Sequence, residues 1–171
     1  MKPIHLALLA GFVACLAACQ SGAPRTFDEA TRAELLGTVK ALEGRWEGKD
    51  PEGNLQAVEF RVSSGGSAVR EIMFPGTPDE MTNMYHLDGD TLVLTHYCAA
   101  GNQPRMRAAR IDAGRLEFQF ESVTDRESAD QVYMGRMTLV VEDQDHIRED
   151  WQALRGDELD HATSFHLTRV R

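Results

Sequence analysis

The sequence predicts an all-β protein, a single antiparallel up-and-down β-barrel of about ten strands with one short N-terminal helix. From Gly44 onward, apolar and polar residues alternate with a period of two, most clearly in Leu116–Glu121 (LEFQFE). Turn residues separate these runs at hairpin-length intervals, and no helical crossover lies between them. A meander of this many strands avoids exposed edges by closing on itself, which favours a barrel.

Residues 1–18 are predicted to be a targeting segment. Lys2 supplies a positive start, and the apolar run Ile4–Ala14 is too short to remain in a bilayer as a spanning helix. The segment ends in Leu16–Cys19 (LAAC), which resembles the lipobox of bacterial lipoproteins. That resemblance implies cleavage before Cys19, diacylation of its thiol and a further acyl chain on the new amino end. The alternative is an ordinary secretory leader followed by a chance cysteine.

Several acyl chains make a stable anchor, so the lipobox implies a membrane partner through the N-terminal lipid. Gln20 after the cysteine resembles lipoproteins sorted to the outer membrane, and the expected location is its periplasmic face. Residues 19–25 are small and polar and are predicted to be a flexible tether, followed by one domain over residues 26–171.

The composition of the mature chain excludes some partners. Residues 1–18 contain Lys2 and no acidic residue, so their removal takes the net charge from −9 to −10. A surface of this charge repels nucleic acid and anionic lipid. With Cys15 removed and Cys19 lipidated, Cys98 has no partner for an internal disulfide, and the apolar core has to hold the fold.

The elements follow in order along the domain. Thr26 and Glu29 form a capping box, and apolar residues recur at helical spacing from Phe27 until Gly44. The strands predicted after this helix are Arg45–Lys49, Leu55–Val62, Ala68–Phe74, Met81–Leu87, Thr91–Cys98, Arg105–Ile111, Arg115–Val123, Val132–Val141, Ile147–Leu154 and Ala162–Arg171.

The segment Leu42–Trp46 (LEGRW), directly after the helix, resembles the Gly-x-Trp signature of lipocalins and fatty-acid-binding proteins, the calycin group. The resemblance implies that Trp46 closes the barrel floor under a basic residue near the chain end, Arg169 or alternatively Arg171. It also implies a small, mostly apolar ligand inside the barrel. The position of Gly48 resembles nitrobindin-like haem barrels more weakly. Two stretches, MYHLDGD and LTHYCAAGNQPRM, resemble a family of bacterial proteins that implies no function.

The stretch Glu80–Met106, which contains two strand-like runs and a polar corner, concentrates the hydrogen-bonding side chains. A two-residue turn at Asp88-Gly89 predicts that Tyr85 faces Leu92 and that Met81 lies near His96. The set that then shares one sheet face is Tyr85, Leu92, Leu94, His96 and Cys98. Its leucines favour this face as the interior, although a β-bulge would reverse the assignment.

The ligand-binding residues expected from this pattern are Glu71, Tyr85, His96, Cys98, Asn102, Gln103 and Arg105. Arg105 alternates with Met106, so its guanidinium group either clamps a ligand carboxylate inside the barrel or lies on a solvated outer face. Glu71 and Glu149 are in phase with apolar neighbours and therefore need a partner, for which Arg105 or Arg107 is the candidate. The alternative for Asn102 and Gln103 is a purely structural role, in which their side-chain amides satisfy the backbone hydrogen-bonding groups of their own loop.

Two other functions remain open at this point. An enzyme could use His96, Cys98 and either Glu71 or Glu149, but residues two apart on a strand lie roughly 6.5–7 Å apart, which is long for a thiol–imidazole hydrogen bond. A structural or assembly-partner lipoprotein would have a filled barrel. No ligand spacing indicates a metal, and no cofactor is predicted, with haem on His161 or His166 kept as an alternative.

Overall fold

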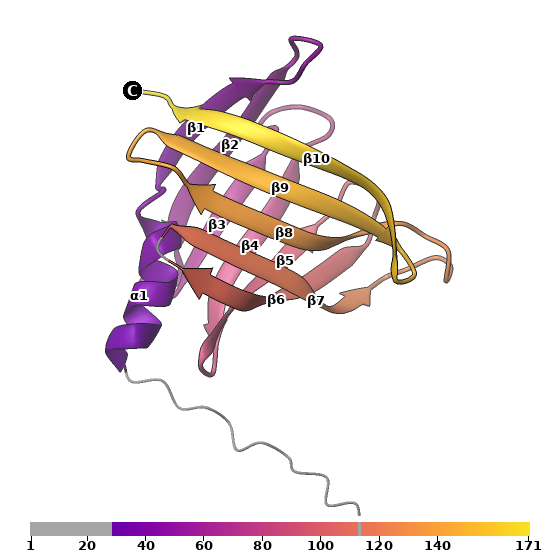
Figure 1. The fold of residues 1–171 in the computed structure, drawn as a ribbon, viewed down its shortest axis with the longest axis horizontal. Coiled ribbons are helices and arrows are strands. Elements are labelled where there is room, and N and C mark those ends of the chain that lie inside the picture. Colours follow the sequence, from indigo (N-terminus) through magenta and orange to yellow (C-terminus); the bar gives the residue numbers. More distant parts are fainter. Residues whose placement is uncertain (1–28, 113) are drawn as a thin grey trace, which may run out of the picture.

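The computed structural model describes residues 29–112 and 114–171, which form ten antiparallel strands and one helix (Figure 1). The leader, Cys19, the tether and the capping residue Thr26 lie outside the described residues. Helix α1 spans Glu29–Lys40. The strands are β1 (Gly44–Lys49), β2 (Leu55–Ser63), β3 (Ala68–Met73), β4 (Met81–Asp88), β5 (Thr91–Tyr97), β6 (Gln103–Asp112), β7 (Arg115–Thr124), β8 (Tyr133–Val141), β9 (His146–Arg155) and β10 (Glu158–Arg169). A short 3-10 turn, Ser64–Gly66, joins β2 to β3.

Each strand pairs with its neighbours in sequence, and β1 pairs with β10, so the sheet closes into a barrel. The predicted fold class is confirmed. The boundaries of nine predicted strands lie within two residues of those observed, whereas β10 begins four residues earlier than expected. The connection between the last two strands, left long by the predicted bounds, contracts to a tight turn in which Gly156 takes a left-handed backbone (φ +61°). The Arg155 guanidinium group binds the Asp160 carboxylate across this turn at 2.9 Å.

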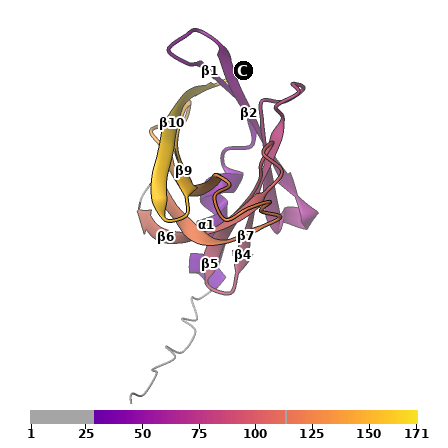
Figure 2. The same cartoon turned by 90° about the vertical axis from the view of Figure 1, so that its right-hand side faces the viewer.

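Helix α1 covers one end of the barrel, where it contacts β2, β3, β4 and β5. Figure 2 looks along the barrel and shows α1 behind the ring of strands. Among the helix residues whose burial is described, 33–40, Leu35, Leu36 and Val39 are buried, so this apolar stripe closes the end of the barrel as the sequence pattern requires. Among the described residues, no helix has the length and apolar character to cross a membrane.

Trp46 and Arg169 meet beside the helix at this closed end. The Trp46 indole is fully buried and donates to Leu42 O at 2.8 Å. The Arg169 guanidinium carbon lies 4.1 Å from the centre of the Trp46 ring. The same guanidinium group donates to Glu43 O at 2.9 Å and to Ala41 O at 3.1 Å, which satisfies carbonyl groups just after the end of α1. Of the two arginines considered from the sequence, Arg169 occupies this position.

Replacing Arg169 with Gln is expected to lower the free energy of unfolding by about 2 kcal/mol, because charged hydrogen bonds and the contact with the indole face are both lost. Arg171→Gln is the matched control, since Arg171 contacts Asp145 and is largely exposed. That control should change stability by less than about 0.5 kcal/mol. Urea unfolding followed by tryptophan fluorescence measures both values, and equal losses would contradict the role given to Arg169.

Candidate functional site

The β4–β5 hairpin places its polar side chains inside the barrel, although its register differs from the prediction. Asp88 pairs with Thr91, and Tyr85 pairs with Leu94 rather than Leu92. The two central turn residues are therefore Gly89 and Asp90. Because the shift is two residues, side chains keep their predicted faces. Tyr85, Leu92, Leu94 and His96 all lie buried in the interior. The sequence predicted that Met81 lies near His96. This prediction was wrong, because Asn83 pairs with His96 instead.

Three buried polar residues, one from each of β3, β4 and β5, lie in a row across the sheet. Glu71 on β3 pairs with Asn83 on β4, which pairs with His96 on β5. The Asn83 amide joins them, since its Nδ2 donates to Glu71 Oε2 at 2.9 Å and its Oδ1 lies 2.7 Å from His96 Nδ1. The Tyr85 hydroxyl donates to the same Glu71 oxygen at 2.6 Å. The register of the hairpin therefore aims two donors at Glu71.

The opposite wall of the barrel supplies a second carboxyl group, Glu149 on β9. Its Oε2 accepts a hydrogen bond from Trp151 Nε1 at 3.1 Å, and the Trp151 ring lies 5.1 Å from the His96 ring. The Glu149 and Glu71 carboxyl groups lie close enough for each to shift the pKa of the other. Two buried carboxylates side by side would repel each other, so a proton on one of them is favoured. The Oε1 atoms of both groups have no hydrogen-bond partner in the described part of the chain.

The donors identify which carboxyl group carries the charge. Burial raises the pKa of Glu71 to about 7, while hydrogen bonds from Tyr85, Asn83 and Glu149 act in the opposite direction. Burial and the negative charge of Glu71 together raise the pKa of Glu149 well above its usual value. At neutral pH, Glu149 is therefore the acid and Glu71 is the group that ionises. A proton on Glu149 reduces the cost of burying two carboxyl groups close together.

The same network fixes the protonation of His96. Because Asn83 Nδ2 is used on Glu71, its Oδ1 faces the imidazole, and His96 Nδ1 must carry the hydrogen of that bond. Burial lowers the pKa of His96 to about 4, so the ring is neutral at pH 7. Nε2 is then a bare acceptor, and no donor among the described residues reaches it. An unsatisfied buried acceptor of this kind is costly.

The centre of the barrel is closely packed around these groups. Glu71, Asn83, Tyr85 and Glu149 are 0% exposed, so no water-sized space adjoins their side chains. Among the described residues, no group of three or more His, Cys, Asp or Glu side chains converges as a metal site requires. The arrangement can hold a proton on the carboxyl pair and accept a hydrogen bond at His96 Nε2.

The remaining predicted site residues lie elsewhere. Cys98 follows the end of β5, where its sulfur accepts from Ala100 N at 3.5 Å, while His96 Nδ1 bonds to Asn83. These two residues therefore do not form the nucleophile–base pair considered above. Asn102 is buried and donates to Val132 O at 3.0 Å. Gln103 donates to Gly101 O at 2.7 Å and accepts from Thr124. These two amides satisfy the loop that contains them and its neighbours.

Arg105 lies on the outer face of β6. It binds Glu121 at 2.5 Å and Asp88 at 2.7 Å, and Arg107 binds the same two carboxylates. The expectation that one of these arginines neutralises Glu71 or Glu149 was wrong. A register shift between Arg105 and Met106 belongs to the β6–β7 pairing, and Met106 is the residue that points into the core. The carboxyl groups instead partner each other across the barrel.

Two members of the network, Asn83 and Trp151, were not considered as site residues from the sequence. Asn83 is in phase with Tyr85, so an amide two residues before an inward tyrosine was the available signal. Trp151 is two residues after Glu149 and shares its face for the same reason. Their contacts depend on barrel curvature and register, which local sequence does not provide.

The fold and the site together define a class: a closed ten-stranded antiparallel barrel, consistent with a calycin-like fold, that holds two buried carboxyl groups in its interior. The sequence matches no family model and no curated protein.

Proposed function

We propose that this chain is a lipid-anchored lipoprotein that faces the periplasm and binds a small, largely apolar ligand inside its barrel. The observation that carries the proposal is the buried polar network, above all the unpartnered Nε2 of His96, inside an otherwise apolar interior. Apolar residues of similar size would fill the same space at lower cost. Buried titratable groups with strongly shifted pKa values gather at functional sites.

The interior chemistry favours a ligand that donates hydrogen bonds. His96 Nε2 and the ionised Glu71 are acceptors, so a hydroxyl or amine group on the ligand complements them. The carboxylate head considered from the sequence depended on inward arginines. Arg105 and Arg107 face outward, and a carboxylate beside Glu71 would instead meet a like charge.

Ligand binding requires side chains at the end of the barrel opposite α1 to move. Phe74, Met81 and Met134 are partly buried there and pack on the core. The Phe74 ring lies 5.8 Å from that of Phe165, and Phe165 pairs with Glu149 across the strands. Displacing Phe74 and the flexible methionines therefore opens a direct route to the carboxyl pair.

The ligand proposal is tested with three probes of equal chain length: decanol, decylamine and decanoic acid. Calorimetric titration at pH 7 should show the alcohol and the amine binding at least about tenfold more tightly than the acid, a difference of about 1.4 kcal/mol. His96→Phe should remove this preference. The matched control His166→Phe, on the exposed face of β10, should keep it. Equal affinities for all three probes, or no binding of any, would contradict the proposal.

The lipid anchor has a separate test. Cells supplied with an alkyne analogue of palmitate should label the wild-type chain and the Cys98→Ala variant equally, because Cys98 is not the acceptor. The Cys19→Ala variant should lose the label and leave the membrane fraction. Equal label in the wild-type chain and in Cys19→Ala, including none in either, would contradict the lipid anchor on Cys19.

A second candidate function is a structural or assembly-partner lipoprotein. Full burial of the side chains at the barrel centre favours it, since a filled barrel needs no ligand. It predicts that the decanol and decylamine titrations give no heat. It also predicts that a protein partner co-purifies with the chain from membranes.

A further inference from the structure

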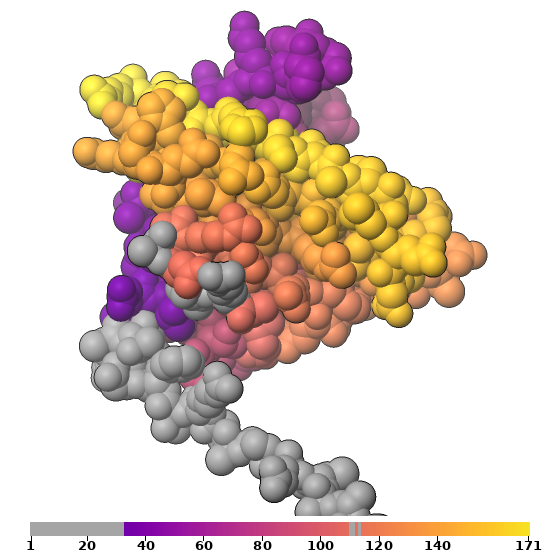
Figure 3. All heavy atoms as spheres, viewed as in Figure 1, coloured from indigo at the N-terminus to yellow at the C-terminus, as the bar shows by residue number. Residues whose placement is uncertain are grey.

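The seam that closes the barrel between β1 and β10 is paired over a short stretch only. Trp46 pairs with Arg169, Glu47 pairs with Thr168, and Val170 N donates to Arg45 O at 2.8 Å. Beyond this point the β1–β2 hairpin stands away from the barrel (Figures 1 and 3). Strand β10 continues past the seam to Glu158, held by β9 alone. Among the described strands, none pairs with the other edge of β10 before Thr168.

The direction of the free backbone groups on this edge follows from the hydrogen bonds at the seam. Arg169 N donates to Asp145 O, on the β9 side, whereas Val170 N donates toward β1. These directions alternate along an antiparallel strand, and the β9 register runs without a shift from His161 to Thr168. The N–H and C=O groups of Ala162 and Ser164 therefore face away from β9. His166 O also points this way, toward Gly48 on β1. A Cβ atom added to Gly48 would lie only 2.0 Å from this oxygen.

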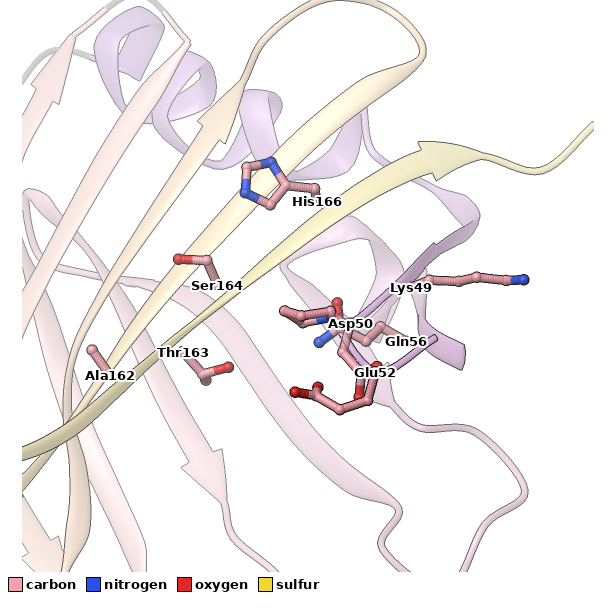
Figure 4. A pocket seen from close by; sticks show the side chains of 9 residues that line it. Lys49, Asp50, Glu52, Gln56, Ala162, Thr163, Ser164 and His166 are labelled. Carbon is pink, nitrogen blue, oxygen red and sulfur yellow. The ribbon is translucent and has the colours of Figure 1, made fainter. Parts of the chain in front are cut away.

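These backbone groups face a groove of about 620 Å³ between β10 and the β1–β2 hairpin. Figure 4 shows Thr163 and Ser164 on the strand, with Asp50, Glu52 and Gln56 grouped on the hairpin. Gln56 is only 8% exposed, and its Oε1 has no hydrogen-bond partner in the described part of the chain. The groove thus offers a strand edge with unpaired groups and one buried acceptor that lacks a donor.

We propose that this seam groove binds an extended peptide of a partner protein, which adds to β10 as an edge strand. Main-chain donors and acceptors at strand spacing match a peptide backbone, and side chains of the added strand can reach Gln56 Oε1. Gly48 of β1 covers the edge at His166, so the free edge runs from Ala162 to Ser164 and is about 10 Å long at about 3.3 Å per residue, which matches about three residues of an added strand.

The surroundings of the groove select among occupants. The hairpin stands beside the β10 edge, which suits one extended chain better than the broad side of a second barrel (Figure 3). On the hairpin side of the groove, the two acidic residues Asp50 and Glu52 and the one basic residue Lys49 leave a negative charge. The whole chain carries a net charge of −9. The peptide is therefore basic. This site does not depend on the interior ligand, because none of the residues that line the groove belongs to the buried polar network around Glu71 and His96.

The first test uses the unchanged full-length chain and a fluorescent heptapeptide of alternating threonine and lysine. Binding is followed by anisotropy, and amide hydrogen exchange is measured at Ala162 and Ser164. The peptide should slow exchange at both amides at least tenfold. Two N-methylated versions, one blocked at odd and one at even positions, should differ: the version that keeps its donors toward β10 binds, and the other does not. Equal binding of both versions would overturn the proposal.

The second test changes the strand edge. Ala162→Pro removes the N–H that faces the groove while leaving the bonds of Thr163 to β9, and proline is tolerated at such edges. It should weaken peptide binding at least tenfold, whereas the matched control Ala162→Ser should bind as wild type. Equal affinity of the two variants would overturn the proposal. So would protection of the Ala162 and Ser164 amides that grows with protein concentration without peptide, because a second copy would then occupy the edge.

Discussion

The free energy of unfolding of the wild-type protein is expected to fall by about 1.4 kcal/mol for each pH unit between about pH 5 and 6. In this range the folded protein keeps the protons of Glu71 and Glu149, while the unfolded chain has lost both. The unfolded chain holds a proton on His96 that the folded protein lacks. The folded state therefore binds one more proton than the unfolded state, and rising pH destabilises it.

The two kinds of group act in opposite directions. A carboxyl group whose pKa is raised by folding stabilises the protein below its unfolded value, 4.5 for Glu71, and this contribution is lost as pH rises through about 7. His96 has its pKa lowered from 6.5 to about 4, so its contribution is present above 6.5 and is lost as pH falls toward 4. Glu149, with its pKa well above 4.5, acts in the same direction as Glu71.

Two variants separate these contributions. His96→Asn keeps a donor toward Asn83 but cannot titrate, so its stability should fall by about 2.7 kcal/mol per pH unit. In the double variant Glu71→Gln, Glu149→Gln only His96 titrates, and its stability should rise by about 1.4 kcal/mol per pH unit. Urea unfolding at several values between pH 5 and 6, followed by tryptophan fluorescence, gives the three slopes. The surface acids are common to all three proteins, so parallel slopes would refute the protonation states given to Glu71, Glu149 and His96.

Gly48→Ala is expected to lower the free energy of unfolding by more than about 3 kcal/mol, the upper range for overpacking. A Cβ at this position would lie 2.0 Å from His166 O and 3.1 Å from His166 C, both of them backbone atoms. No side-chain rotation relieves this contact, so β1 and β10 have to separate. Separation of the seam exposes the Trp46 indole, and its fluorescence emission should move to longer wavelength.

Gly135→Ala is the matched control for this prediction. Its Cβ would lie 2.3 Å from Cδ1 and 2.6 Å from Cγ of Leu154, which belong to a flexible side chain. Leu154 can rotate away, so the expected loss is about 1 kcal/mol, with unchanged Trp46 emission. Urea unfolding measures both variants. Equal losses in the two variants would show that the β1–β10 contact at Gly48 is not limiting.

Local patterns in the sequence predict most of the fold because antiparallel hairpins are local structures. The alternation of apolar and polar residues, with the turn residues, predicted nine strands to within two residues. The predicted β10 was too short because a bulge at Leu159–His161 interrupts the period of two. Tyr85 and His96 were placed inside correctly even though the turn was assigned one residue too early. That error moves the register by two residues and so preserves the face.

The partners of the buried groups were harder to predict, because they join strands far apart in the chain. The sequence showed that Glu71 and Glu149 alternate in step with apolar residues and so face the core. However, β3 and β9 are not paired, and their side chains approach each other only because the sheet closes into a barrel. Arg105 was the charged group of opposite sign in a neighbouring segment, and charge alone made it the candidate partner. Strand phase places it outside, where Asp88 and Glu121 neutralise it.

The Arg169 contact with Glu43 joins residues 126 positions apart in the chain. Every other pair of hydrogen-bonded strands consists of sequence neighbours. The β1–β10 pair instead joins the two ends of the domain. The entropy of closing so long a loop makes it the slowest step in which native contacts form. Refolding should therefore pass through an open, curved sheet of paired hairpins, and the burial of Trp46 should mark the moment at which that sheet becomes a cylinder.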